Sequence, residues 1–88
     1  VVLGFDELDS YLGEHPYFGA IIGRIAGRVP GGVLEVEGRT LRLETNDGIN
    51  HLHGGVRGFD KVNWQAEPGS ANEPRLTLRH HSPDGDQG

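Results

Sequence analysis

Two histidines, His51 and His53, stand two residues apart and directly before a glycine pair, Gly54 and Gly55. An imidazole can donate or accept a hydrogen bond near neutral pH, and glycine lets the main chain approach a bound ligand closely. In extended backbone, residues two apart share one strand face, so the two rings would lie together. The segment predicts a ligand site with His53 as its first candidate. His51 is interpreted as a structural or exposed residue. The competing interpretation of His53 is also a structural residue, whose ring nitrogens bond to backbone groups.

The histidine segment is expected to follow a turn and a β-hairpin. The residues Asn46-Asp47-Gly48 form a turn signal, after which residues 49–53 return as extended chain. Before that turn, apolar and charged residues alternate over residues 34–43 around Gly38, which predicts the hairpin. Its outer charges are expected to pair across the strands, Glu35 and Glu37 with Arg39 and Arg42.

Other stretches carry patterns of their own. Alternation over residues 64–66 and 76–78 predicts a second strand pair around a polar loop. Apolar residues at helical spacing predict one or two helical turns between an N-cap at Asp6 and a stop at Gly13. Residues 19–29 fit either a short helix or extended chain with glycine kinks.

Composition indicates the fold class and excludes some partners. With 15 Gly and 5 Pro among 88 residues, the short alternating stretches indicate an all-β fold of short strands and tight turns. A formal net charge of −5, with only 8 Lys and Arg, argues against nucleic acid as a partner. No apolar run approaches the roughly 20 residues that span a bilayer, so no membrane partner is expected. The sequence has 0 Cys, which suits a reducing compartment, and the cytoplasm is the default expectation.

Five motifs give the chain a resemblance to the aldose 1-epimerase (galactose mutarotase) family. They lie at residues 15–19, 23–28, 50–55, 57–61 and 81–88. The resemblance covers essentially every residue and corresponds to an early internal portion of an enzyme several times longer. It implies that residues 1–88 are a single partial domain, the N-terminal portion of a large antiparallel β-sandwich.

The resemblance also implies which residues touch the sugar. The histidine of the family's Leu-His-Gly-Gly motif hydrogen-bonds substrate, a role that falls to His53. A substrate-contacting arginine is implied at Arg28, whose guanidinium offers several fixed donors to neighbouring hydroxyls. Gly27 stands where the family pattern Gly-Arg-x-Ala-Asn-Arg has Asn, which removes one polar contact worth roughly 0.5–1.5 kcal/mol. Arg24 matches the motif at a non-contacting position and is interpreted as a bracing arginine.

The activity implied is interconversion of the α and β anomers of a free aldohexose such as galactose or glucose. The family uses general acid–base catalysis without a cofactor or a metal. Its acid histidine and base glutamate are implied to lie beyond Gly88, so no catalytic residue is assigned within the chain. The chain alone is expected to be inactive, its expected partner is a small sugar, and no oligomeric state is predicted.

Several alternatives stay open. A non-catalytic sugar-binding or regulatory relative would keep the fold and lack proton transfer. An epimerase of hexose 6-phosphates would need additional basic residues to hold the phosphate.

A metal site at the four histidines is disfavoured because adjacent His80 and His81 would point to opposite strand faces. Asp84 and Asp86 are interpreted as turn residues rather than a catalytic carboxylate pair. The aromatic residues are interpreted as packing, with Trp64 also a candidate pocket wall: Tyr17, Phe18, Phe59 and Trp64.

Overall fold

The computed structural model describes all of residues 1–88, and strands dominate it. Six short strands are present: β1 (Arg28–Val29), β2 (Val33–Val36), β3 (Arg39–Arg42), β4 (His51–Leu52), β5 (Gln65–Pro68) and β6 (Leu76–Arg79). Helical structure is limited to α1 (Asp9–Leu12) and two 3₁₀ turns, η1 (Pro30–Gly32) and η2 (Phe59–Lys61). The expected all-β fold is confirmed.

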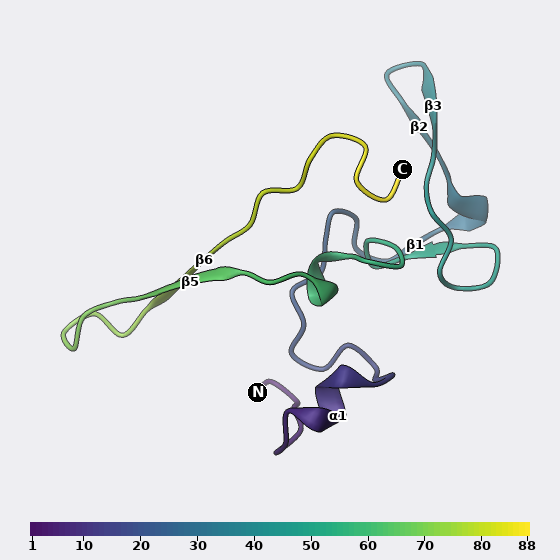
Figure 1. Ribbon diagram of the computed structural model, residues 1–88. Coiled ribbons are helices and arrows are strands. Elements are labelled where there is room, and N and C mark those ends of the chain that lie inside the picture. Colours follow the sequence, from purple (N-terminus) through teal and green to yellow (C-terminus); the bar gives the residue numbers. More distant parts are fainter.

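The strands form three separate two-stranded antiparallel sheets, β1–β4, β2–β3 and β5–β6. Figure 1 shows the hairpins β2–β3 and β5–β6 projecting in different directions from a middle region that contains β1 and β4. The Cα radius of gyration is 15.5 Å, whereas a compact domain of this length would have about 12 Å. The chain is therefore open in shape, with a middle region and projecting arms.

The hairpin β2–β3 is confirmed, but its charges do not pair as expected. Glu37 (φ 49°) and Gly38 (φ 77°) form the two-residue turn, whose positive φ values suit the right-handed twist of the strands. This turn places Glu35 opposite Thr40, and the Thr40 hydroxyl donates to the Glu35 carboxylate. No ion pair forms with Arg39 or Arg42 because Glu37 lies in the turn and Glu35 already faces a threonine.

Two further expected elements are confirmed. The turn at residues 46–48 is closed by backbone hydrogen bonds, among them Asn50 N–H to the Asp47 carbonyl at 3.0 Å. The second strand pair is β5–β6, in which Ala66 lies opposite Leu78. The turn leads directly into β4 and so determines where the histidine segment starts.

The N-terminal third differs in detail from expectation. The helix α1 starts only at Asp9, with Leu8 in the N-cap position, and no side chain caps it, so the expected cap at Asp6 is wrong. Residues 19–27 contain no helix, which leaves the extended alternative, and the segment runs into β1. No helix in the structure is long and apolar enough to cross a membrane.

The buried centre is small and consists mainly of backbone. Seven of the 88 residues are buried, and Val29 is the only one of them with a hydrophobic side chain. Most of the others are glycines: Gly23, Gly32, Gly54, Gly55 and Gly58. Closely approaching main-chain segments therefore hold the middle region together, and the apolar faces of the hairpins are left partly uncovered.

Candidate functional site

His53 is held against Gly27 by two hydrogen bonds. The His53 backbone N–H donates to the Gly27 carbonyl at 3.0 Å, and the Gly27 N–H donates to His53 Nδ1 at 3.0 Å. Because Nδ1 accepts, the neutral ring carries its own proton on Nε2. His53 therefore presents an N–H donor on the side of the ring away from Gly27.

The backbone of His53 is not extended. Strand β4 ends at Leu52, and His53 has a φ of 49°, in the left-handed region that residues other than glycine rarely adopt. The expectation that His51 and His53 share one strand face is therefore wrong. The ring of His53 instead lies edge-on to Tyr17, with 4.9 Å between the ring centroids.

Arg28 follows Gly27 and pairs in register with Leu52, the neighbour of His53. The β1–β4 pairing thus brings the two predicted sugar-binding residues next to each other along the backbone. Arg28 Nε lies 2.5 Å from Asp47 Oδ2, and the arginine side chain is 60% exposed. An ion pair this exposed contributes about 0–1 kcal/mol, so Asp47 orients the guanidinium without holding it firmly.

Asn46 is a site-forming residue that sequence reasoning treated only as part of a turn. Its side-chain amide donates to the Leu52 carbonyl at 2.9 Å, and its Oδ1 accepts from the Leu52 N–H at 2.7 Å. The side chain thus pairs with both backbone groups of the residue that stands between His51 and His53. Nothing in a turn signal indicates this reach, because it depends on where β4 lies.

The glycine pair packs closely against other parts of the chain. Gly54 has a φ of 96°, and a Cβ there would overlap the Gly23 carbonyl oxygen. A Cβ on Gly55 would meet Gln87 Oε1 at 2.8 Å and His51 Cε1 at 3.1 Å. The glycines therefore permit close packing within the chain, and the expectation that they also leave space for a ligand stays a prediction.

A polar cavity of about 710 Å³ adjoins His53 through Tyr17, and its wall includes Asn46, Asp60 and Lys61. Lys61 Nζ lies 5.9 Å from the Tyr17 ring centroid and 2.9 Å from Asp60 Oδ2. Asp60 has a side chain only 3% exposed and no aligned hydrogen bond on that oxygen, so charge attraction to Lys61 stabilises it.

Neither predicted sugar-binding side chain lines this polar cavity. Arg28 and His53 are also absent from the walls of two other cavities, one beside Arg24 and one beside Trp64. Their convergence on a single sugar therefore stays a prediction. Tyr17 and Lys61 were not among the candidates, although both belong to the motifs at residues 15–19 and 57–61.

His51 is structural, as interpreted from the sequence. The residue is 2% exposed, and its Nδ1 lies 2.7 Å from the Glu44 carbonyl oxygen. Because a carbonyl only accepts, Nδ1 must carry the proton, which leaves a lone pair on Nε2 of the neutral ring.

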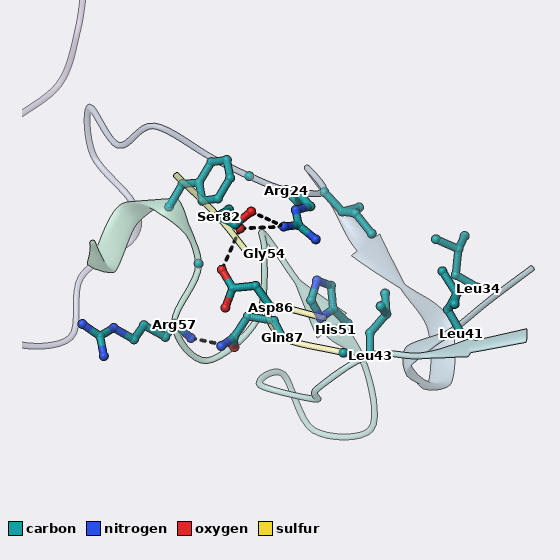
Figure 2. Close-up of a pocket in the computed structure, with 15 residues that line it drawn as sticks. Arg24, Leu34, Leu41, Leu43, His51, Gly54, Arg57, Ser82, Asp86 and Gln87 are labelled. Atoms are coloured by element: carbon teal, nitrogen blue, oxygen red, sulfur yellow. Dashed lines mark hydrogen bonds between the residues drawn. The ribbon is translucent and has the colours of Figure 1, made fainter. Parts of the chain in front are cut away.

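Arg24 braces the C-terminal segment, as expected. One guanidinium nitrogen donates to the Ser82 carbonyl (3.0 Å) and the Ser82 hydroxyl (2.8 Å), as Figure 2 shows. The same nitrogen donates to the Pro83 carbonyl at 2.7 Å. The Ser82 hydroxyl in turn donates to Asp86 Oδ2 at 2.8 Å. Residues 84–87 form a turn, so the interpretation of Asp84 and Asp86 as turn residues is confirmed.

The aromatic residues around η2 pack with one another. His80 lies 5.5 Å from the Phe59 ring and 5.3 Å from the Trp64 ring, centroid to centroid. Trp64 also lines a shallow cavity of about 600 Å³, together with His80 and His81. The structure contains no group of three or more His, Cys, Asp or Glu side chains placed to hold a metal ion.

Solved structures share this arrangement of strands. Galactose 1-epimerase from Lactobacillus acidophilus NCFM matches with a TM-score of 0.82 and 36% identity, over 98% of this chain and 26% of that one. An aldose epimerase homologue from C. elegans matches with a TM-score of 0.81 and 27% identity, over 99% of this chain and 26% of that one. The fold is therefore part of the β-structure of the sugar epimerases.

The family model for aldose 1-epimerase matches residues 1–88, and the chain belongs to the aldose 1-epimerase family. It is 49% identical over 88 residues to galactose mutarotase from Sus scrofa and 49% identical to that from Homo sapiens. It is 37% identical over 87 residues to aldose 1-epimerase from Escherichia coli (strain K12). The chain spans 25% of the length of each of these relatives.

Proposed function

We propose that the polypeptide carrying residues 1–88 is an aldose 1-epimerase that interconverts the α and β anomers of a free aldohexose such as galactose or glucose. Membership of the family supports this, as do the galactose mutarotases and the aldose 1-epimerase among its relatives. Because the chain spans 25% of those relatives, residues 1–88 are proposed to be one partial domain of a longer polypeptide, called the full-length enzyme below.

The observation that carries the proposal is the arrangement at Gly27. Its N–H turns the His53 ring so that Nε2–H is free to donate, and the next residue, Arg28, supplies a largely exposed guanidinium. An acceptor oxygen of a sugar suits the imidazole donor, and neighbouring hydroxyls suit the planar guanidinium fork. The pair is proposed to bind and orient the pyranose.

Proton transfer is proposed to lie outside these residues. The resemblance assigns it to a histidine acid and a glutamate base beyond Gly88, which open and close the sugar ring at C1. Each such group typically contributes about 10²–10⁴-fold in rate, so residues 1–88 alone are proposed to have no useful turnover. The proposed partner is a small sugar, and the cytoplasm is the proposed compartment, which fractionation of expressing cells would test.

The test follows the conversion of pure α-galactose by the full-length enzyme, coupled to a dehydrogenase specific for the β anomer. Arg28→Ala and His53→Ala are each expected to lower kcat/KM about tenfold, the value of a lost hydrogen bond. His81→Ala, at an exposed histidine, is the matched control and should leave kcat/KM unchanged. Absence of any turnover above the spontaneous rate would contradict the proposal.

The alternative is a non-catalytic sugar-binding or regulatory relative with the same fold. Gly27, in place of the Asn of the family pattern, is the observation that favours it, since one polar contact to the sugar is missing. Calorimetric binding of galactose without anomer conversion by the full-length protein would select this alternative.

A further inference from the structure

Tyr17 has a backbone conformation that its local structure does not require. Its φ is 58°, in the left-handed region that residues other than glycine rarely adopt. The residue is the first of a turn that the Ala20 N–H closes onto the Tyr17 carbonyl at 3.2 Å, and the geometry of a β-turn is set by its second and third residues. Such a conformation persists where the surrounding structure fixes it, so the cause is expected in the contacts of the Tyr17 side chain.

The Tyr17 ring contacts two residues from different motifs, His53 and Lys61. Its centroid lies 4.9 Å from that of the His53 ring at an interplanar angle of 70°, the geometry of an edge-to-face aromatic pair. Lys61 Nζ lies over the ring, 5.9 Å from its centroid, which is within the range of a cation–π interaction. Neither contact uses the Tyr17 hydroxyl, so both depend on the ring alone.

Lys61 is itself held in place by its neighbour in η2. Lys61 Nζ lies 2.9 Å from Asp60 Oδ2, and the Asp60 side chain is only 3% exposed. A carboxylate so well buried has little freedom to move, so it restrains the ammonium group that faces the Tyr17 ring. The ring therefore has a support that does not depend on His53.

The His53 ring needs a second contact to fix its orientation. The Gly27 N–H donates to Nδ1 at 3.0 Å and thereby selects the tautomer with a proton on Nε2. A single hydrogen bond tolerates a misalignment of about 30°, so it leaves the tilt of the imidazole partly free. That tilt determines where the Nε2–H points, and the packed Tyr17 ring restricts it.

We infer that Tyr17 is a positioning residue, whose ring holds the His53 imidazole at the tilt that aims its Nε2–H at the sugar. The sugar as the target of this N–H rests on the proposed function, whereas the packing of the two rings does not. Tyr17 acts through His53 and has no contact of its own with the substrate. The Asp60–Lys61 pair supports the ring, and the Tyr17 hydroxyl is not needed.

Kinetics of the full-length enzyme test whether the ring or the hydroxyl is required. Tyr17→Leu is expected to lower kcat/KM by up to about tenfold, the effect expected for losing the His53 hydrogen bond itself. Tyr17→Phe retains the ring and should restore the parent value. Tyr11→Leu is the matched control, because Tyr11 packs edge-on against Phe5 and should leave kcat/KM unchanged. A loss in Tyr17→Phe as large as that in Tyr17→Leu would overturn the inference, since the hydroxyl would then be the functional group.

A double-mutant cycle tests whether Tyr17 acts through His53. Tyr17→Leu should lower kcat/KM in the parent enzyme and cause no further loss in a His53→Ala background, because the imidazole that it orients is already absent. Equal losses in the two backgrounds would mean that Tyr17 acts independently of His53, and the inference would be wrong.

Nuclear magnetic resonance of ¹⁵N-labelled histidine gives a test that needs no turnover. At alkaline pH, the parent enzyme should show His53 with a protonated Nε2 and an unprotonated Nδ1. In Tyr17→Leu the looser ring should bond less often to Gly27 and populate the other tautomer, so the two nitrogen shifts should approach each other. Tyr11→Leu should leave them unchanged, and unchanged shifts in Tyr17→Leu would refute the inference. If the shifts respond but the parent enzyme converts no anomer, Tyr17 positions His53 and the proposed function fails.

Discussion

His51 and His53, two residues apart, hold opposite tautomers. His51 Nδ1 donates to the Glu44 carbonyl at 2.7 Å, whereas His53 Nδ1 accepts from the Gly27 N–H at 3.0 Å. The first ring therefore offers an acceptor at Nε2 and the second a donor at Nε2. Their roles separate accordingly: His51 belongs to the packing of the fold, and His53 is available to a ligand.

The donor role of His53 predicts different effects for two amides in the full-length enzyme. His53→Asn keeps an acceptor for the Gly27 N–H and loses the Nε2–H donor, whereas His53→Gln places a donor near the Nε2 position. We expect kcat/KM to fall about tenfold in His53→Asn and by less in His53→Gln, because one hydrogen bond to the sugar is worth up to about 1.5 kcal/mol. The coupled anomer assay measures both. The reverse order would mean that Nδ1 is the functional nitrogen.

The ion pair between Arg28 and Asp47 predicts that Asp47 restrains the guanidinium. Asp47→Asn is expected to lower KM for galactose by up to about fivefold, because an exposed ion pair contributes at most about 1 kcal/mol. Arg28→Lys keeps a positive charge beside Asp47 but loses the planar fork, so KM should rise, with a smaller effect than the tenfold loss of kcat/KM expected for Arg28→Ala. Steady-state kinetics on the full-length enzyme separate the two variants. A raised KM in Asp47→Asn would show that the pair preorganises Arg28 for the sugar.

Gly27 predicts that the Asn of the family pattern can be restored. Its φ is 81°, and an added Cβ would meet no heavy atom within 4 Å. Asparagine tolerates this left-handed region better than most residues, so Gly27→Asn should lower the free energy of unfolding by less than about 1 kcal/mol. The regained contact is expected to lower KM. Gly27→Val is the control, because a β-branched residue at positive φ should cost about 1–2 kcal/mol or more. Urea unfolding measures the change in stability, and steady-state kinetics measure KM. An unchanged KM in Gly27→Asn would place this position outside the sugar site.

The packing of Gly54 predicts a large loss of stability on adding one methyl group. Gly54→Ala would place its Cβ in the Gly23 carbonyl oxygen at a φ of 96°. Gly38→Ala is the matched control, since its φ of 77° is also positive but its Cβ would meet nothing within 4 Å. The left-handed backbone should lower the free energy of unfolding of both variants by about 1–2 kcal/mol. In Gly54→Ala the overlap should lower it by about 1–3 kcal/mol more. Urea unfolding midpoints measure the difference in stability between the two variants. Equal losses of stability would show that the segments carrying Gly54 and Gly23 can move apart.

Local patterns in the sequence determined much of the secondary structure. Alternation around Gly38 identified β2–β3, alternation around a polar loop identified β5–β6, and the Asn46-Asp47-Gly48 signal identified the turn before β4. These elements depend on side-chain period and turn chemistry within a few residues, so the sequence is sufficient for them. The motifs also predicted the family, which the match over residues 1–88 confirms.

Only the tertiary structure decided the orientation of the functional groups. The bonds from Asn46 to Leu52 and from His51 to the Glu44 carbonyl depend on how residues 44–52 fold back on themselves, and the tautomer of His53 depends on Gly27, which lies beside it through the pairing of β1 with β4. That pairing joins segments more than twenty residues apart, and a local pattern carries no information about which distant backbone groups will meet. For the same reason, the sequence indicated that Gly54 is important, but only the position of the Gly23 carbonyl showed that Gly54 permits close packing within the chain.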